Sequence, residues 1–319
     1  MEKYFEKLCS VLEKKQPVLI QTHDFPDHDA IGAAYALGKL LETCGYKVKI
    51  GYGGLIQSLP LMEFVKFLNS ELLLVDLLDE PTKFQVIIVD GSPFKGTVKK
   101  VGGILKAVID HHPPRTKSTA PFTDIRPETG ACCSIIWLYW KEAVKEYDKI
   151  TATAMLAGIQ LDTNFLSRHV SRTDMDAYYE LYFKTDVQIT QQMLKTTITA
   201  NELEEIGRAF MNSVRINNFL LIELEKDYSR ALLSAVADFL LWLKDIVFVV
   251  VIETYGEEFK LSARSRDKML DAGYIIQNAL KEIGKGGGHA HMAGGVVKAE
   301  KYPGKKALLE LIVKKAHSI

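Results

Sequence analysis

Short apolar runs alternate with helix-like stretches over the first half of this chain. The sequence predicts strands at PVLIQTH, YKVKIGYGG, FQVIIVDG and KAVIDHH, and the last two read as strands buried on both faces. It predicts helices at AIGAAYALGKLLETCG, which stops at Gly45, at GACCSIIWLYWKEAVKEY and at ITATAMLAGIQLDT. Strands that alternate with helices favour an α/β fold with a parallel sheet and right-handed crossovers.

The pattern changes after about residue 183. A polar, helix-compatible stretch is followed by strand patterns at FLLIELEK, IVFVVVIET and FKLSARSR and by helix patterns at ALLSAVADFLLWLK and DAGYIIQNALKEIG. We therefore expect a parallel-sheet domain over residues 1–185, a helical connector over residues 186–210 and a smaller mixed α/β domain over residues 211–319. We place the active site in the cleft between the two domains, where the open edge of the parallel sheet would lie.

The composition narrows the classes of function. The 319 residues carry 40 basic and 40 acidic side chains, so no net charge draws the protein to duplex nucleic acid or to an anionic membrane. Four cysteines without a CxxC pair argue against a zinc ribbon or a disulfide framework and favour a reducing compartment. The most apolar stretch, LLSAVADFLLWLKDIVFVVVIE, is interrupted by three charged residues, so we expect a cytoplasmic protein with no membrane partner.

Polar side chains follow the ends of the predicted parallel strands. His23 and Asp27 follow the first strand, Asp90 ends VIIVD, and Asp110 and His111 end the run VIDHH. Asp162 follows a predicted helix and can reach the same edge. Because ligands gather beyond the carboxyl ends of such strands, we expect these segments to converge.

Six of these side chains form a candidate metal-ligand set of four carboxylates and two imidazoles: His23, Asp27, Asp29, Asp90, His111 and Asp162. The set is wrong for a structural zinc site and too large for one ion. It suits Mn²⁺ or Mg²⁺, and histidine favours Mn²⁺. Two ions about 3.5–4 Å apart that share a carboxylate would generate a hydroxide for attack on a phosphoester. Taken singly, each residue has a plainer explanation: HDFPDHDA is also compatible with a proline turn into an Asp-capped helix.

Several motifs resemble those of a known family. HDFPDHDAIG, VIIVDG, VIDHHPP and LDTNF resemble motifs one to four of the DHH phosphoesterase superfamily, in that order. LSARSR and GGGHAHMAGG resemble the DHH-associated C-terminal domain, so the resemblance covers nearly the whole chain. The length and the single short connector resemble the branch that contains nanoRNases, which degrade short oligoribonucleotides, and pAp phosphatases.

The resemblance implies a role for each residue. His23 and Asp27 would bind the first metal ion, and Asp90 would bridge the two ions. The second ion would be bound by Asp29, His111 and Asp162. His112 would face the substrate phosphate, with Asp110 supporting it from behind. In the C-terminal domain the residues that would hold the substrate are Arg264, Ser265, His289 and the glycines Gly286, Gly287 and Gly288, whose backbone N–H groups can approach a phosphate or a base.

The function that this resemblance implies is a Mn²⁺-dependent phosphoesterase, with Mg²⁺ or Co²⁺ as compatible cofactors. Two metal ions would activate a hydroxide that cleaves short single-stranded oligoribonucleotides to mononucleotides, or pAp to AMP, and a homodimer is compatible with the sequence. The alternative substrates are cyclic dinucleotides, their linear products or polyphosphate. A non-catalytic nucleotide-binding protein is disfavoured because all six ligand positions are kept.

Overall fold

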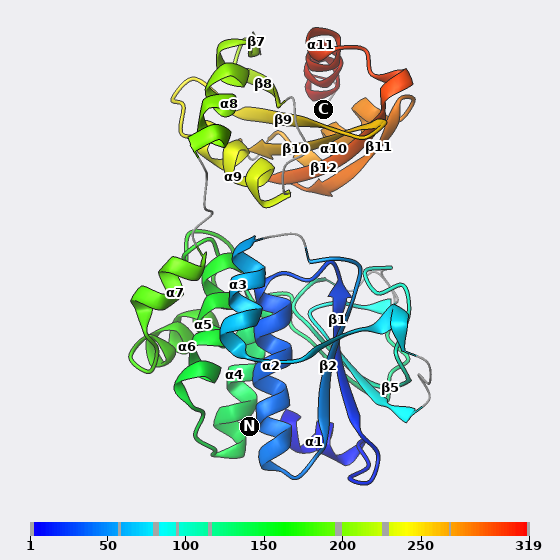
Figure 1. The fold of residues 1–319 in the computed structure, drawn as a ribbon, viewed down its shortest axis with the longest axis vertical. Helices are drawn as coiled ribbons and strands as arrows, with labels where there is room; N and C mark the ends of the chain where they lie inside the picture. Colours follow the sequence, from blue (N-terminus) through cyan, green and yellow to red (C-terminus); the bar gives the residue numbers. More distant parts are fainter. Residues whose placement is uncertain are drawn as a thin grey trace. The chain divides into compact units, whose positions relative to one another are not determined.

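A computed structural model describes residues 3–56, 59–78, 83–93, 96–113, 117–194, 200–224, 230–267 and 269–317. The chain divides into two compact units, Met1–Lys195 and Thr196–Ile319 (Figure 1). The expected α/β class is confirmed, and each unit is described here by itself.

The first unit is built on a parallel sheet of six strands in the order β3-β2-β1-β4-β5-β6. Its strands are β1 (Val18–Asp24), β2 (Val48–Gly53), β3 (Leu72–Leu74), β4 (Gln85–Val89), β5 (Ile104–Asp110) and β6 (Phe122–Ile125). The four predicted strands are the four central ones. The two strands that the sequence reading missed, β3 and β6, are short and lie at the edges, where three or four residues carry little periodicity.

Both faces of this sheet are buried, which explains the continuous apolar runs. Ile20, Ile87 and Ile109 face one core together with the helices, whereas Leu19 and Val86 face a second core. The helices are α1 (Tyr4–Ser10), α2 (His28–Thr43), α3 (Leu59–Leu68), α4 (Cys132–Ala143), α5 (Lys149–Asp162), α6 (Arg172–Tyr182) and α7 (Val187–Leu194) (Figure 1). Helix α2 packs on α4 and α5, so its N-terminus, the end of α5 and the ends of β1, β4 and β5 are held by one core.

The second unit is a mixed sheet in the order β11-β12-β10-β9-β8-β7, in which only the β8–β9 pair is parallel among the described pairs. Its strands are β7 (Val214–Ile216), β8 (Phe219–Leu224), β9 (Phe248–Tyr255), β10 (Glu258–Ser265), β11 (Gly284–His289) and β12 (Met292–Lys298). Its helices are α8 (Ala200–Met211), α9 (Arg230–Leu240), α10 (Ala272–Leu280) and α11 (Lys305–Ala316). Helices α10 and α11 cover one face of the sheet, and α8 and α9 contribute to the core on the other.

Two segments show how the local sequence is used. GKGGGHAHMAGGVVK, which by itself is also compatible with a flexible turn, forms the antiparallel hairpin of β11 and β12. The predicted connector contains two helices that belong to different units, since α7 packs on α3 and α5 and α8 packs on β8.

No helix within the described ranges is long and apolar enough to cross a membrane.

Candidate functional site

The six candidate ligands lie together at the carboxyl edge of the first sheet. Within the described residues, three groups have ligand atoms that all lie within 4.8 Å of one another. One group is His23, Asp27 and Asp90; the second is Asp29, His111 and Asp162; the third is Asp90, His111 and His112. The first two groups match the predicted division of the ligands between two ions, and Asp90 connects them.

The Asp90 carboxylate lies between the two groups. Its Oδ2 is 3.7 Å from His23 Nε2, and its Oδ1 is 3.3 Å from His111 Nε2. The residue is 2% exposed and has a φ of 53°, a left-handed conformation that is uncommon for aspartate and that clusters at functional sites. Its backbone N–H donates to Ile109 O at 2.9 Å, so the neighbouring strand holds it in place. One carboxylate with each oxygen turned to a different group has the geometry of a bridging ligand.

The two histidines are oriented by backbone carbonyl groups. His23 Nδ1 lies 2.8 Å from Asp24 O, and His111 Nδ1 lies 3.1 Å from Thr129 O. A proton on Nδ1 satisfies each of these contacts and leaves the Nε2 lone pair for a cation that the carboxylates would share. This is the arrangement by which metal-ligating histidines are normally fixed.

The two aspartates of the first motif are fixed by helix ends. Asp27 is the N-cap of α2, with Oδ1 accepting from Ala30 N at 3.0 Å and Oδ2 3.9 Å from His23 Nε2. Asp29 is 1% exposed, and its two oxygens accept from the N–H groups of Cys132 and Cys133 at 2.6 and 2.9 Å. Asp29 therefore joins the start of α4 to the cluster, a contact that sequence spacing gives no sign of.

The buried charges change one another's pKa values. Burial lowers the pKa of His23, but the Asp27 carboxylate 3.9 Å away and the charge of Asp90 outweigh it and raise the pKa to about 10. Burial raises the pKa of Asp29 well above its ordinary value, and the charges of Asp90 and Asp162 add to the effect. Burial and the charges of Asp27 and Asp90 raise the pKa of Asp162 against the hydrogen bond to His111, which lowers it. A cluster of carboxylates this close is stabilised by added positive charge.

His112 and Asp110 form a pair next to the cluster. His112 Nδ1 is 2.9 Å from Asp110 Oδ1, and the same oxygen accepts from His112 N at 3.0 Å. Asp110 is fully buried, whereas the side chain of His112 is 43% exposed. The carboxylate thus fixes the ring of a side chain that is partly exposed.

The donor set fits two divalent cations. Asp90 Oδ1 and His111 Nε2 are both buried, and His111 Nε2 lies 3.3 Å from Asp90 Oδ1 and 3.1 Å from Asp162 Oδ2, so these three atoms can be shared by one cation. Oxygen-rich donors with two imidazoles suit Mn²⁺ and related ions, and a structural zinc site would favour thiolates. His23, Asp27 and Asp90 can hold one ion, and Asp29, Asp90, His111 and Asp162 can hold a second.

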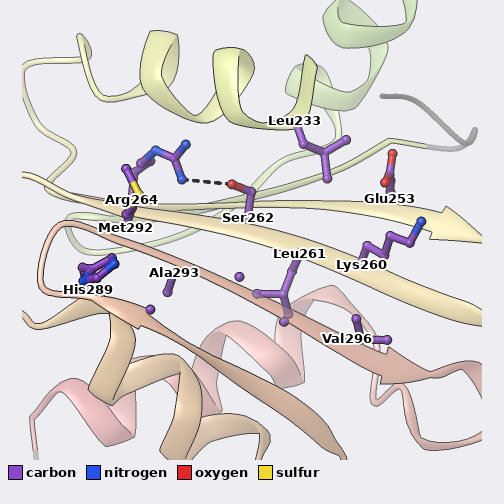
Figure 2. A pocket seen from close by; sticks show the side chains of 13 residues that line it. Leu233, Glu253, Lys260, Leu261, Ser262, Arg264, His289, Met292, Ala293 and Val296 are labelled. Carbon is purple, nitrogen blue, oxygen red and sulfur yellow. Dashed lines mark hydrogen bonds between the residues drawn. The ribbon is translucent and has the colours of Figure 1, made fainter. Parts of the chain in front are cut away.

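A pocket of about 400 Å³ lies in the second unit (Figure 2). Arg264, Gly288 and His289 line it, and the Arg264 guanidinium is held by Asp238 at 2.7 Å and by Ser262 at 3.1 Å. Ser265 lies one residue further along β10, and its hydroxyl donates to Asp267 O at 3.1 Å rather than lining the pocket.

The three glycines of the predicted substrate site lie in strand β11. Gly286 faces the core, since an added Cβ would lie 2.7 Å from Ile276 Cγ2. A Cβ on Gly287 would point into open space, with no atom within 4 Å. Gly288 adopts a φ of 159°, and a Cβ there would clash with Met292 O. The stretch therefore presents an open face at Gly287 and depends on glycine for close packing at its neighbours.

Reasoning from the sequence missed several side chains of this pocket: Leu233, Glu253, Lys260, Ser262, Met292 and Val296. The sequence does contain a signal for two of these residues, Lys260 and Ser262. In KLSARS every second residue lies on one face of the strand, so Lys260 and Ser262 follow once Arg264 is placed in a pocket. The other members come from β9, β12 and α9, and only the pairing of strands brings them together.

Comparison with known proteins identifies both units. Residues 17–159 match the family model described as the DHH family, N-terminal domain, and residues 217–315 match the DHHA1 domain. An uncharacterized protein from Methanocaldococcus jannaschii is 34% identical over 306 residues, which cover 94% of this chain. The matched region spans only 62% of that relative's length.

Two solved structures share the fold. An exopolyphosphatase-related protein from Bacteroides fragilis superposes with a TM-score of 0.80 at 20% identity, over 99% of this chain and 96% of that one. The exonuclease RecJ bound to manganese superposes with a TM-score of 0.56 at 14% identity, over 100% and 95% of the two chains. The two family models together cover most of the sequence, in the order that the motifs predict. The chain belongs to the DHH phosphoesterase superfamily, with a DHH domain followed by a DHHA1 domain.

Proposed function

We propose that this protein is a metal-dependent phosphoesterase that hydrolyses a small nucleotide substrate, either a short single-stranded oligoribonucleotide or pAp. The observation that carries the proposal is the Asp90 carboxylate between two groups of ligand atoms. That geometry supports two divalent ions that share one carboxylate, and Mn²⁺ is the ion that the mixed donor set favours.

Two ions bound in this way would lower the pKa of a water molecule and so supply a hydroxide nucleophile near neutral pH. Asp90 keeps the two ligand groups at a fixed separation, because its backbone is bound to the neighbouring strand. His23 and His111 present Nε2 without needing to reorient, which keeps the site preorganised.

His112 is the side chain that we assign to the substrate phosphate. Asp110 holds its Nδ1 and so fixes the ring, and Nε2 is the atom that we assign to donate to a phosphoryl oxygen as negative charge develops. Asp110 is a positioning residue in this scheme. The pocket of the second unit that Arg264 and His289 line, called the DHHA1 pocket below, is assigned to the remaining part of the substrate.

The substrate class is tested with a panel of candidates. The purified protein is incubated with Mn²⁺ and an RNA dinucleotide, a five-residue RNA, pAp, a cyclic dinucleotide or polyphosphate, and products are separated by chromatography. Rapid loss of the RNA dinucleotide or of pAp is expected. Cleavage of polyphosphate or of the cyclic dinucleotide alone would keep the metal site and overturn the proposed substrate.

The metal site is tested in the same assay with Asp90→Asn, which removes one anionic ligand atom and is expected to lower turnover by about 10²-fold or more. Asp76→Asn is the matched control, because Asp76 is an exposed carboxylate of the same unit that lies outside the cluster. Equal activity of Asp90→Asn and the control would contradict the bridging assignment.

A further inference from the structure

Asp238, on helix α9, makes a contact in the second unit that the catalytic proposal does not use. Its Oδ1 accepts a hydrogen bond from Nε of Arg264 at 2.7 Å, and Arg264 lines the DHHA1 pocket. Asp238 is 26 residues away from Arg264 along the chain and does not itself line the pocket. The contact therefore joins a side chain outside the pocket to a cation inside it.

The Arg264 guanidinium is held at two of its three nitrogen atoms. Nε donates to Asp238, and Nη1 donates to Ser262 Oγ and to Ala263 O, both at 3.1 Å. Figure 2 shows the guanidinium next to Ser262, on the same side of the sheet as Leu233 of α9. Among the described residues no hydrogen bond engages Nη2. Its two N–H groups are the donors that remain for a ligand of the pocket.

The burial of Arg264 explains why its charge needs a partner. The residue is 8% exposed, and a guanidinium buried without a negative charge beside it is costly. Ser262 and Ala263 supply acceptors but no charge, whereas Asp238 supplies both. Three hydrogen bonds also fix the side chain before a ligand arrives, so little rotamer freedom is left to lose on binding.

The position of Asp238 in its own helix points in the same direction. It lies in the last turn of α9 (Arg230–Leu240), where the partial negative charge of the helix end disfavours a carboxylate. Its neighbour Ala237 is fully buried, but the Asp238 side chain is 58% exposed, and so open an ion pair contributes little to stability. Helix stability therefore does not account for this carboxylate, whereas holding Arg264 does.

We propose that Asp238 is a positioning residue, which fixes Arg264 so that Nη2 donates to an anionic oxygen of the nucleotide in the DHHA1 pocket. The inference rests on the proposed function in that it takes the ligand to be a nucleotide. Asp238 does not touch the ligand and acts only through Arg264. Leu233, Leu261 and Met292 line the same pocket, so the contact between Nη2 and an anion is less screened there than in water.

The test compares AMP with adenosine, which differ only in the phosphate. Calorimetry measures the binding of each to the full chain in the presence of a chelator, so that metal ions contribute nothing to the affinity for phosphate. The unmodified protein is expected to bind AMP about tenfold more tightly than adenosine, the size of one hydrogen bond between charged groups. Asp238→Ala is expected to weaken AMP binding by about fivefold or more and to leave adenosine binding unchanged.

Further variants separate position from charge. Asp238→Asn keeps an oxygen that accepts from Nε and removes the repulsion of the phosphate, so it is expected to bind AMP at least as tightly as the unmodified protein. In an Arg264→Ala background, Asp238→Ala is expected to change nothing more. Asp245→Ala, at an exposed aspartate of the same unit, is the matched control and keeps both affinities.

The hydrolysis assay supplies a second measurement. Asp238→Ala is expected to raise KM with little change in kcat, because the contact that it disturbs holds the bound substrate before and during the reaction. A purely structural role would leave KM unchanged in the folded protein. If Asp238→Ala does not fold, Asp238→Ser takes its place, since the shorter hydroxyl does not reach Nε of Arg264.

Four results overturn the inference: equal affinity of the unmodified protein for AMP and adenosine, unchanged AMP binding in Asp238→Ala, equal loss of AMP and adenosine binding in that variant, or an effect that persists without Arg264. AMP binding that depends on Asp238 through Arg264, without hydrolysis of any substrate, would support the inference and contradict the proposed function. Mn²⁺-dependent hydrolysis with unchanged AMP binding in Asp238→Ala would do the reverse.

Discussion

Single residues of this protein are placed by contacts that the local sequence does not display. The N-cap aspartate Asp27 keeps one oxygen for its helix and turns the other toward His23. The motif HDFPDHD therefore uses one turn for both helix capping and ligand placement. His28, in the same turn, packs on Phe64 with ring centroids 5.2 Å apart, and burial lowers its pKa to about 4. It is a core side chain, separate from the ligand set.

Glu180 gives a prediction at the residue scale. Partial burial raises its pKa, but hydrogen bonds from Lys141 at 2.8 Å and Tyr147 at 2.7 Å outweigh this and hold the pKa below its ordinary value. A carboxyl with a lowered folded pKa stabilises the protein above its unfolded pKa, and that contribution is lost as pH falls through the folded value. Glu180→Gln is expected to lower the free energy of unfolding by about 1 kcal/mol at pH 7.

The pH dependence distinguishes this effect from simple packing. The difference in the free energy of unfolding between Glu180→Gln and the unmodified protein should shrink as pH falls below about 4.3, the ordinary pKa of glutamate. It should vanish once Glu180 is also neutral in the folded protein. Urea unfolding between pH 3 and pH 7 measures it, with the exposed Glu146→Gln as the control. A difference that is constant over this pH range would show that the charge of Glu180 contributes nothing.

At the scale of elements, the site depends on how closely three helices approach. Gly158 of α5 faces α2 and α4, and a Cβ there would lie 2.5 Å from Cys133 Sγ and 2.6 Å from Asp29 Oδ1. Gly158→Ala is therefore expected to cost about 1–3 kcal/mol of stability through overpacking and to weaken Mn²⁺ binding by displacing Asp29. Thermal unfolding and metal titration measure the two effects.

Gly207→Ala is the matched comparison for that substitution. Gly207 lies exposed in α8 with no atom within 4 Å of an added Cβ, so alanine should stabilise the helix by up to about 1 kcal/mol. The two glycine replacements should thus change the stability of the protein in opposite directions. Stabilisation by Gly158→Ala, with metal binding unchanged, would show that the contact between helices relaxes freely.

The elements also show how far sequence patterns reach. Long apolar runs such as FQVIIVDG gave strands because burial on both faces leaves a continuous signal. Helix α6 is capped by Ser171, whose side chain forms a capping box with Asp174 three residues later, a pattern that is visible in the sequence. The hairpin of β11 and β12 was not predicted as strands because glycine has low strand propensity, and its pairing with β10 supplies the stability instead.

At the scale of the whole molecule, the metal centre is expected to stabilise the first unit. Burial and mutual repulsion disfavour charge on Asp29 and Asp162, and bound cations relieve both costs. Saturating Mn²⁺, at about 100 times its Kd, should add about 2.7 kcal/mol of stability, and a chelator should remove it. For a unit of this size that corresponds to a rise in Tm of roughly 5–10 °C.

Calorimetry of the full chain resolves this effect, because only the transition of the first unit should move. Asp90→Asn should lose most of the shift, whereas Asp76→Asn should keep it. An equal shift in both variants would place the stabilising ion outside the cluster. An equal shift of the second unit's transition would point to general binding of cations.

The sequence by itself determined the α/β class, the central strands and which polar residues follow those strands, because apolar periodicity and the order of polar residues along the chain are local properties. The family followed from the same motifs and is confirmed. The assignment of the clustered histidines and aspartates as metal ligands stays a prediction, and so does the identity of the substrate.

Only the tertiary structure decided how those residues meet. The Asp90 carboxylate turns one oxygen to each ligand group, Asp29 is bound to the start of α4, and Arg264 of β10 donates to Asp238 of α9. Each of these contacts joins segments that are far apart along the chain, and their sequence separation does not say how close they lie in space. They are set by strand order, by register and by the packing of helices, which depend on the whole core rather than on any one stretch of sequence.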